Sequence, residues 1–509
     1  MSDRLLSGHG PLDVVLGGGL PANAISLITG LPGTGKTIIA QQYVFQNARP
    51  ESPAVYFSTV SEPLEKIVRF GQNLDFFDRA AIGKYIFYED LGAVVSTGGL
   101  ASVTKQIAAV LKERRPRLIV IDSFKALHAF ADSNSDFREF LYELAGILSA
   151  LAVSSLWVGE YEEAEVGSLA EFAVADAILN LVAKGVGQRE MRFLTVRKLR
   201  GSGFRSGQHA YRLSGSGLHL SPRFANTLIE AEYRLGDVRA SSGIPALDEL
   251  LGSGYWPGAS TLIAGPSGTG KTLMGLHFIF NGARQGEPGV IASLQENRTQ
   301  LQRVAAGFGW SLSEPHVEVM YRSPVDIYID EWVYELIQVV ERTGARRVLV
   351  DSLADLRIAA ADETRFQEFV YSLVQRFSQQ GVIILMTLEI RDLFHAERLS
   401  DSAISHLSDN VVLLNYIKEE KSISRAMAVI KSRASYHDPG IRQFKIGPDG
   451  IVLADSALPP SEPDADPVKP ERRTASRRAS KPKTSRQHSQ ASPSGGGRPE
   501  DWPLRQHLC

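Results

Sequence analysis

Cysteine is almost absent from this chain, because Cys509 is the only one among its 509 residues. A disulfide within the chain is therefore excluded, and a reducing compartment is expected. An excess of either charge is also missing, since 55 basic residues face 57 acidic ones and leave a formal net charge of −2. This balance gives no general reason to expect nucleic acid or an acidic membrane as a partner.

Long apolar stretches are missing too. No uninterrupted apolar run reaches membrane-spanning length, and the N-terminal MSDRLLSGHGPLD has no apolar signal core. We therefore expect a cytoplasmic protein with no membrane partner. The composition, 43% hydrophobic and 22% charged, is typical of a soluble globular protein. Because single cores stop growing beyond about 250–300 residues, the chain length predicts two or three domains.

The chain does contain a long internal repeat. GLPGTGKT (30–37) returns as GPSGTGKT (265–272), and RPRLIVIDSFKAL (115–127) returns as ARRVLVDSLADL (345–356). Further on, VRKLRGSGF (196–204) is matched by VIKSRASYH (429–437). All three pairs keep a nearly constant separation of about 230 residues, which indicates that a whole domain is duplicated.

Each copy predicts an α/β fold. Short, almost wholly apolar strands such as AISLITG, PAVYFS and PGVIAS alternate with amphipathic helices, which indicates a mainly parallel central sheet covered on both faces. Each copy then ends in β-type segments and glycine turns, which predict a small antiparallel extension. We expect two tandem domains over 1–225 and 226–457, with the linker near residues 222–240.

The remaining residues, 458–509, differ in composition. Proline, serine, arginine and lysine dominate, with RRTASRRASKPKTSR at the centre and eight basic residues against one acid between 467 and 490. Such a segment cannot bury enough apolar surface to fold alone, so a disordered basic tail is expected. A regulatory or partner-docking tail is the alternative interpretation.

The two glycine loops have the pattern of a P-loop. In such a loop backbone N–H groups surround phosphate oxygens, the lysine reaches the β- and γ-phosphates, and the next hydroxyl ligates Mg²⁺. The predicted nucleotide-binding residues are Gly30, Gly33, Thr34, Gly35, Lys36 and Thr37 in the first copy and Gly265, Gly268, Thr269, Gly270, Lys271 and Thr272 in the second. We therefore expect ATP and Mg²⁺ as cofactors.

Acidic residues near the loops are candidates for the metal and for catalysis. Asp122 and Asp351 end buried strands, where a P-loop protein places its second Mg²⁺ ligand, although each could also be a helix cap. Glu62 in VSEPLEKI and Glu296 in LQENRTQL could orient or deprotonate the nucleophile. They could equally be early-helix acids favoured by the helix dipole, so both interpretations stay open.

Together these motifs resemble those of the KaiC-type circadian-clock ATPases, a branch of the RecA-like P-loop superfamily. The resemblance covers about residues 5–455. It is carried by the lead-ins SGHGPLDVVLGGGLP and SSGIPALDELLGSGYWP, the twin P-loops, and VLLNYIKEEKSISRAMAVIKSRASYHDPGIRQF. It implies two tandem RecA-like domains in a double-ring homo-hexamer that holds ATP between subunits.

The same resemblance assigns further residues. Lys198, Arg200, Lys431 and Arg433 would reach the phosphates held by a neighbouring subunit and stabilise charge on the transferred phosphoryl group. The alternative is that they are ordinary surface cations on an exposed strand.

Two departures from the family pattern bear on activity. The family has two adjacent glutamates after the second strand, whereas this chain reads Ser61-Glu62 and Gln295-Glu296. Gln295 can position water but is not a base, so slow turnover is expected if that position carries the chemistry. The family's second domain also phosphorylates itself on a Ser-Thr pair. The matching pair here is Ser405-His406, which implies Ser405 as the acceptor, with His406 as a second candidate or an interface histidine.

We expect an ATPase, and a Ser/Thr autokinase, whose ring reports its nucleotide state to protein partners such as KaiB-like proteins or kinases and response regulators. One alternative is a RecA-like DNA-dependent ATPase. That would call for basic or aromatic strand-binding loops, which the repeats do not show, so nucleic acid is not expected. The other alternative is a scaffold that ATP stabilises and that does not hydrolyse it.

Overall fold

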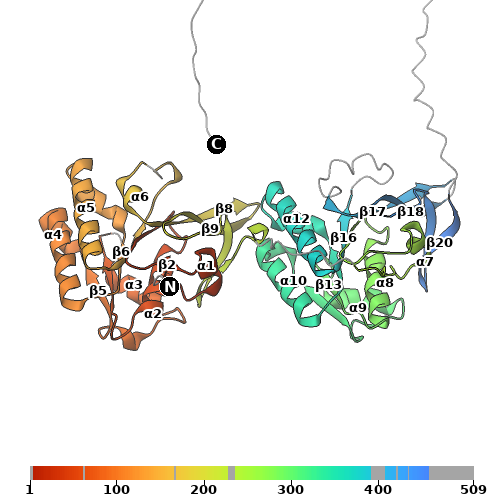
Figure 1. Cartoon of the computed structure of the whole chain (residues 1–509), viewed down its shortest axis with the longest axis horizontal. Coiled ribbons are helices and arrows are strands. Elements are labelled where there is room, and N and C mark those ends of the chain that lie inside the picture. The colour runs from red at the N-terminus through yellow and green to blue at the C-terminus, as the bar shows by residue number, and fades with distance from the viewer. Residues whose placement is uncertain are drawn as a thin grey trace, which may run out of the picture. The chain divides into compact units, whose positions relative to one another are not determined.

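The computed structural model describes residues 4–60, 63–165, 168–226, 236–390, 407–419, 422–433 and 435–457. Within these ranges each repeat is built around one nine-stranded sheet (Figure 1). The tail predicted over 458–509, the acceptor pair Ser405-His406 and the acid Glu62 lie outside the described residues. The expected boundaries at 225/226 and 457/458 stay predictions.

The first sheet is parallel over six strands and antiparallel over its last three. In spatial order its strands are β5 (Ile86–Asp90), β4 (Ala54–Ser58), β6 (Leu118–Asp122), β7 (Ser154–Gly159), β3 (Ile25–Gly30), β8 (Ala177–Val186), β9 (Arg189–Leu199), β10 (His209–Ser214) and β11 (Gly217–Ser221). The chain enters through β1 (Arg4–Leu5) and β2 (Leu20–Pro21), which pair with each other.

Helices cover both faces of this sheet because alternate strand residues point to opposite sides. On one face Tyr56 and Val120 share a core with Ile39 of α2, and on the other Val55 shares a core with Val103 of α4. The helices and 3₁₀ turns are α1 (Gly10–Val15), α2 (Lys36–Asn47), α3 (Leu64–Gly71), η1 (Arg79–Ala81), α4 (Gly92–Arg114), η2 (Phe124–Phe130), α5 (Asn134–Ala150), η3 (Glu163–Glu165), α6 (Ala170–Val174) and η4 (Phe224–Asn226).

The second sheet repeats this order. Its strands are β14 (Val317–Tyr321), β13 (Gly289–Ser293), β15 (Arg347–Asp351), β16 (Ile383–Glu389), β12 (Ser260–Gly265), β17 (Asn410–Lys418), β18 (Ile423–Ser432), β19 (Arg442–Gly447) and β20 (Gly450–Ala457). The helices are α7 (Pro245–Leu250), α8 (Lys271–Arg284), α9 (Arg298–Ala306), η5 (Pro324–Asp326), α10 (Ile329–Thr343), α11 (Leu353–Ala359) and α12 (Glu363–Gln380). The predicted α/β fold, with two mainly parallel sheets and antiparallel extensions, is confirmed.

One described helix, α4, is long and apolar enough to cross a membrane by length and composition alone. Its backbone leaves helical geometry at Gly99, where φ is 64°. Val103, Ile107 and Val110 of the same helix are buried in the core of the first repeat. The helix therefore packs as a core element.

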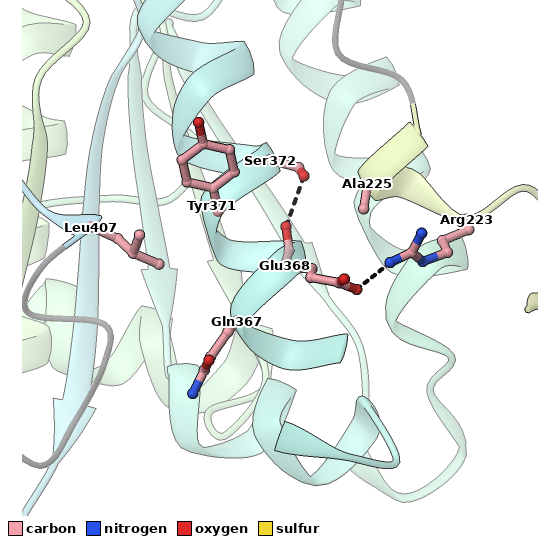
Figure 2. Close-up of a pocket in the computed structure, with 7 residues that line it drawn as sticks. All are labelled: Arg223, Ala225, Gln367, Glu368, Tyr371, Ser372 and Leu407. Atoms are coloured by element: carbon pink, nitrogen blue, oxygen red, sulfur yellow. Dashed lines mark hydrogen bonds and ion pairs between the residues drawn. The ribbon is translucent and has the colours of Figure 1, made fainter. Parts of the chain in front are cut away.

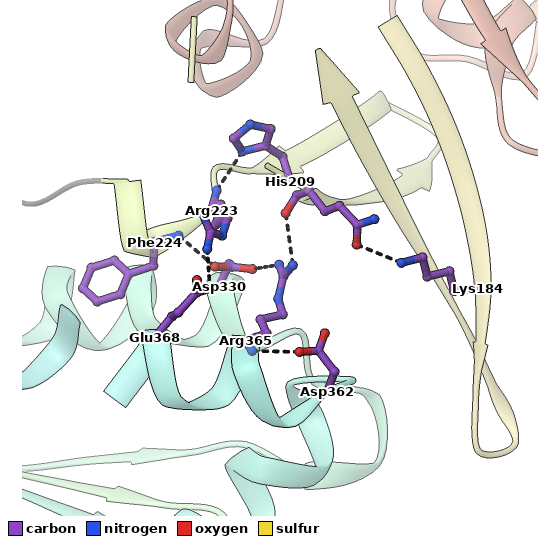
Figure 3. Close-up of polar contacts among 9 residues, drawn as sticks. Lys184, His209, Arg223, Phe224, Asp330, Asp362, Arg365 and Glu368 are labelled. Carbon is purple, nitrogen blue, oxygen red and sulfur yellow. Dashed lines mark hydrogen bonds and ion pairs between the residues drawn. The ribbon is translucent and has the colours of Figure 1, made fainter. Parts of the chain in front are cut away.

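The two repeats contact each other through charged and aromatic side chains (Figure 3). Asp330, at the start of α10, accepts a hydrogen bond from the backbone N–H of Phe224 at 2.9 Å and forms an ion pair with Arg365 of α12. Arg365 also donates to the carbonyl of Gln208 at 3.1 Å. Because Phe224 is buried in the core of the second repeat, the end of the first repeat is anchored there.

Candidate functional site

The two P-loops adopt the geometry that their glycines were expected to permit. The first runs from the end of β3 to the start of α2, and the second runs from β12 to α8. Gly35 and Gly270 precede the helices with φ values of 87° and 104°, a region that side chains disfavour. A Cβ at Gly35 would also lie 2.7 Å from Leu213 Cδ1. The helix N-termini therefore face the loops. The N–H groups of a helix's first turn have no partner within the helix, and such groups attract phosphate.

Both P-loop lysines fold over their own loop. Lys36 Nζ donates to the Leu31 carbonyl at 2.9 Å, and Lys271 Nζ donates to the Pro266 carbonyl at 2.8 Å. Thr34 and Thr269 brace the same loops through hydroxyl hydrogen bonds of 2.8 Å to Leu31 and Pro266. Burial lowers the pKa of each lysine, and nearby carboxylates oppose that shift.

The predicted metal residues meet in both repeats. Thr37 Oγ1 donates to Asp122 Oδ2 at 2.8 Å, and Thr272 Oγ1 donates to Asp351 Oδ2 at 2.7 Å. Each pair offers a hydroxyl and a carboxylate oxygen, the hard ligands that Mg²⁺ prefers. No group of three or more His, Cys, Asp or Glu forms a metal site among the described residues. The pairs therefore fit an ion that takes its other ligands from water and phosphate.

Neighbouring hydroxyl groups hold the two aspartates differently. Tyr56 donates to Asp122 Oδ2 at 2.6 Å, whereas Thr387 donates to Asp351 Oδ1. Asp351 is almost fully buried, and this burial raises its pKa against the hydrogen bonds from Thr387 and Thr272. Neither Tyr56 nor Thr387 stands out in the sequence, because each lies within an apolar strand.

A pocket of about 680 Å³ opens at the first P-loop. It is lined by Gly33, Gly35, Lys36, Thr37 and Asp122 from the predicted set, and by Lys66, Phe70 and Glu160, among others. This volume suits a nucleotide-sized ligand.

Another hollow, of about 420 Å³, lies where the first repeat meets α12 (Figure 2). It is lined by Arg223, Ala225, Gln367, Glu368, Tyr371, Ser372 and Leu407. Its lining includes no P-loop residue, so we assign it no role in nucleotide binding.

The catalytic candidates of the second repeat lie beside Asp351. Gln295 Nε2 donates to Ser352 Oγ at 3.2 Å, which orients its amide toward the residue that follows Asp351. Glu296 is half-buried, and its Oε2 has no hydrogen-bond partner among the described residues. Burial raises the pKa of Glu296, and the nearby Asp351 adds to the shift. Gln295 carries an amide, which is not a base. Glu296 is therefore the residue of this pair that can accept a proton.

The strand register compares this position with the first repeat. Ser58 pairs with Asp122 in the same way that Ser293 pairs with Asp351. Counted along the sequence from Ser58 and Ser293, Ser61 rather than Glu62 is the residue that corresponds to Glu296. Glu62 itself lies outside the described residues, so its role stays a prediction.

Four cations are expected to act at the nucleotide of a neighbouring subunit, and none of them lies near the P-loop of its own repeat. They are Lys198, Arg200, Lys431 and Arg433. Lys198 donates to the carbonyl of Ala173 at 3.1 Å, and Arg200 pairs with Asp176 at 3.4 Å. Asp176 in turn accepts from the N–H of Ile25, the first residue of β3. The P-loop follows the other end of β3, about 20 Å away for a six-residue strand.

The second repeat has the same arrangement. Lys431 donates to the Ser408 carbonyl at 2.7 Å, and Arg433 lies 3.9 Å from Asp409, which accepts from Ser260 at the start of β12. Each Lys-x-Arg segment thus lies near the start of the strand that leads into its own P-loop, whereas the P-loop follows the other end of that strand. Arg200 and Arg433 are more than half exposed, with side chains 62% and 57% accessible.

Comparisons with known proteins identify a family for both repeats. A family model described as "ATPase: KaiC" matches residues 7–223 and again residues 240–457. The chain is 28% identical over 462 residues to circadian clock oscillator protein KaiC 1 of Synechocystis sp., which covers 87% of this chain and 88% of that protein. It is 28% identical over 470 residues to circadian clock protein KaiC3 of Synechocystis sp., covering 89% and 92% of the two chains.

The chain is also 27% identical over 461 residues to circadian clock oscillator protein KaiC of Synechococcus elongatus, with coverage of 87% and 88%. The resemblance drawn from the motifs is confirmed, since the family model matches both repeats. The chain belongs to the KaiC family of ATPases.

Proposed function

We propose that this protein binds ATP with Mg²⁺ at both P-loops, hydrolyses it, and transfers phosphate to itself in the second repeat. The observation that carries the proposal is the contact between the P-loop threonine and the strand-end aspartate, at 2.8 Å for Thr37–Asp122 and 2.7 Å for Thr272–Asp351. This contact joins two motifs that lie some 80 residues apart in each repeat.

The residues of each loop have separate tasks in the proposed reaction. The N–H groups at the start of α2 or α8 hold the phosphate oxygens, and Lys36 or Lys271 neutralises charge at the β- and γ-phosphates. Thr37 with Asp122, and Thr272 with Asp351, would hold Mg²⁺, which supplies positive charge to the phosphates when bound.

In the second repeat Glu296 is the base in this proposal. The pKa of Glu296 is raised and so lies closer to the working pH than that of an ordinary carboxyl group, which suits a general base. Its unpartnered Oε2 leaves one acceptor free for a water molecule or for the hydroxyl of an acceptor residue.

We further propose a homo-hexameric ring in the cytoplasm. The position of Lys198, Arg200, Lys431 and Arg433 opposite their own P-loops supports a role for them at a neighbour's nucleotide. Such a ring would signal its nucleotide state to protein partners, for which KaiB-like proteins and kinases or response regulators are the candidates. Ser405, or else His406, would accept the phosphate.

The test is incubation of the purified full chain with Mg-ATP, followed by phosphate-release measurement, intact mass and phosphosite mapping. Mapping is done at neutral pH because phosphohistidine is lost in acid. We expect phosphate release that a Lys36→Ala/Lys271→Ala double variant abolishes, and phosphate on Ser405 or His406 that Asp351→Asn abolishes.

The alternatives predict different outcomes. Hexamers that form with ATP but release no phosphate would identify a scaffold and overturn the hydrolysis proposal. Release that depends on single-stranded DNA would identify the DNA-dependent motor. Release without any phosphosite would restrict the protein to an ATPase.

A further inference from the structure

We propose that Glu160 is a catalytic residue of the first repeat, the carboxylate that accepts a proton from the attacking water. This inference rests on the proposed ATP hydrolysis and adds a residue to it. Glu160 directly follows β7, the strand beside β3. Because Thr29 of β3 pairs with Gly159, Glu160 lies next to Gly30, where the P-loop begins.

Glu160 faces the lysine that binds phosphate. Its Oε1 lies 3.9 Å from Lys36 Nζ, and both residues line the pocket at the first P-loop. The lysine side chain is 8% exposed and that of Glu160 is 57% exposed, so the carboxylate stands at the solvent side of the pair. Burial lowers the pKa of Lys36, and the charges of Glu160 and Asp122 oppose this shift. Glu160 has the larger effect of the two.

The other acid that lines this pocket is already engaged. Asp122 accepts hydrogen bonds from both Thr37 and Tyr56 through one oxygen, which commits it to the threonine side of the loop. Counted along the sequence from Ser58 and Ser293, the residue that corresponds to Glu296 is a serine, Ser61, which lies outside the described residues. Within the described residues of the pocket, Glu160 is therefore the carboxylate left for proton transfer.

The second repeat has a glutamate at the same position. Glu389 ends β16 and pairs with Gly265, the first residue of the second P-loop. Burial lowers the pKa of Lys271, and the charge of Glu389 opposes this shift more strongly than that of Asp351. Both repeats thus place an acid beside the P-loop lysine. They do so although the strands before this acid differ in sequence, SSLWVG in the first repeat and IILMTL in the second.

The distance leaves room for the chemistry. At 3.9 Å the pair is too far apart for a direct hydrogen bond, and a phosphate held by Lys36 could leave one water molecule between itself and Glu160. The water oxygen forms a bond to the γ-phosphorus while the bond from that phosphorus to the bridging oxygen breaks. The electron pair stays on ADP, and the water proton passes to the Glu160 carboxylate, which returns it to solvent.

The experiment uses the full chain with Lys271→Ala, so that turnover comes from the first P-loop. In this parent we would compare Glu160→Gln, Glu62→Gln and the exposed control Glu162→Gln. Phosphate release gives kcat and KM, and titration with a fluorescent ATP analogue gives the binding constant. We expect Glu160→Gln to lower kcat by about 10²–10⁴-fold. Binding of the analogue should change less than about threefold, because the lysine and the loop remain.

Each other outcome has a defined meaning. A Glu160→Gln variant with the kcat of the parent overturns the inference, as does a loss confined to Glu62→Gln. A Glu160→Gln variant that no longer binds the analogue shows a binding role instead of a catalytic one. If the Lys271→Ala parent releases no phosphate, hydrolysis at the first P-loop fails and Glu160 fails with it. The parent rate thus separates failure of the proposed function from failure of the inference.

Discussion

Single hydroxyl groups determine how Asp122 and Asp351 are held. Asp122 accepts hydrogen bonds from Thr37 and Tyr56 on Oδ2, whereas Asp351 accepts one on each oxygen, from Thr272 and Thr387. A buried carboxylate is costly unless its oxygens are paired. The hydroxyl donors therefore stabilise the two aspartates, and Thr37 and Thr272 also form part of the proposed metal site.

Replacing Thr272 by valine should test that dual role. The change removes the donor to Asp351 Oδ2 and should lower the free energy of unfolding by about 1–3 kcal/mol, because a buried acceptor loses its partner. Denaturant unfolding without nucleotide is the measurement. Thr272→Ser keeps the hydroxyl and is the matched control. Equal unfolding of the two variants would contradict the prediction.

Glu296→Gln should raise stability while it lowers turnover. Burial raises the folded-state pKa of Glu296 above its ordinary value of 4.5, so its contribution to stability is fully present below that value. The contribution is lost as the pH rises through the raised pKa, because the half-buried group must then carry charge. The variant, which cannot ionise, should therefore melt higher than the parent at pH 8 and gain little at pH 4.

Melting curves for Glu296→Gln across this pH range make the measurement. The exposed Glu51→Gln variant serves as the control for loss of one surface charge. A stability gain that does not grow with pH would show that Glu296 ionises without penalty in the folded protein.

At the scale of elements, strand β10 touches both repeats. Tyr211 donates from its hydroxyl to the carbonyl of Thr34 in the first P-loop at 2.7 Å. The next residue, Arg212, points to the other face, where it pairs with Glu331 at 2.9 Å and lies 4.2 Å above the ring of Tyr328 in the second repeat. The alternation of a β-strand thus links the first P-loop to the second repeat through adjacent residues.

Tyr211→Phe should therefore weaken ATP binding at the first P-loop. The ring keeps its packing, but the loop loses a hydrogen bond worth about 1 kcal/mol that holds it in this shape, so the affinity should fall by up to roughly fivefold. Titration with the fluorescent ATP analogue in the Lys271→Ala background measures it, with the exposed Tyr142→Phe as control. An unchanged affinity would show that the hydroxyl does not help to shape the loop for nucleotide.

Much of the element order could be predicted from the sequence, because apolar strands ending in Gly30 or Asp122 identify both a buried parallel sheet and its functional edge. The same signal could have found Glu160 and Glu389, since each is also an acid at the end of an apolar strand. Tyr56 could not be found this way, because a tyrosine in AVYFS is indistinguishable from a core residue. Its hydroxyl acquires a role only when β4 and β6 pair.

The position of the Lys-x-Arg segments also needed the structure. Lys198 and Lys431 follow their P-loops by more than a hundred residues, and the sequence does not show at which end of the sheet β9 and β18 finish. Antiparallel pairing of β8 with β9, and of β17 with β18, returns these segments to the start of the P-loop strand. From this position the lysine and arginine of a segment cannot reach phosphates bound at the P-loop of the same repeat without a large rearrangement.

At the scale of the whole molecule, this geometry predicts complementation between two defective variants. Lys271→Ala disables the second P-loop but keeps Arg433, whereas Arg433→Ala keeps the P-loop but lacks the cation. If Arg433 serves a neighbour's nucleotide, each variant alone should lose autophosphorylation of the second repeat. A mixed ring restores interfaces in which an intact P-loop faces an intact Arg433.

The expected recovery follows from the symmetry of the proposed ring. With equal amounts of both chains and random assembly, half of the P-loops are intact and half of the neighbouring cations are intact. About one quarter of the interfaces should then be active. Phosphosite mapping on a mixture that has been dissociated and reassembled with Mg-ATP measures this fraction, and a mixture that is not reassembled is the control. A mixture as inactive as its components would mean that Arg433 does not act between subunits, and the exposed pairing of Arg433 with Asp409 would then be its resting role.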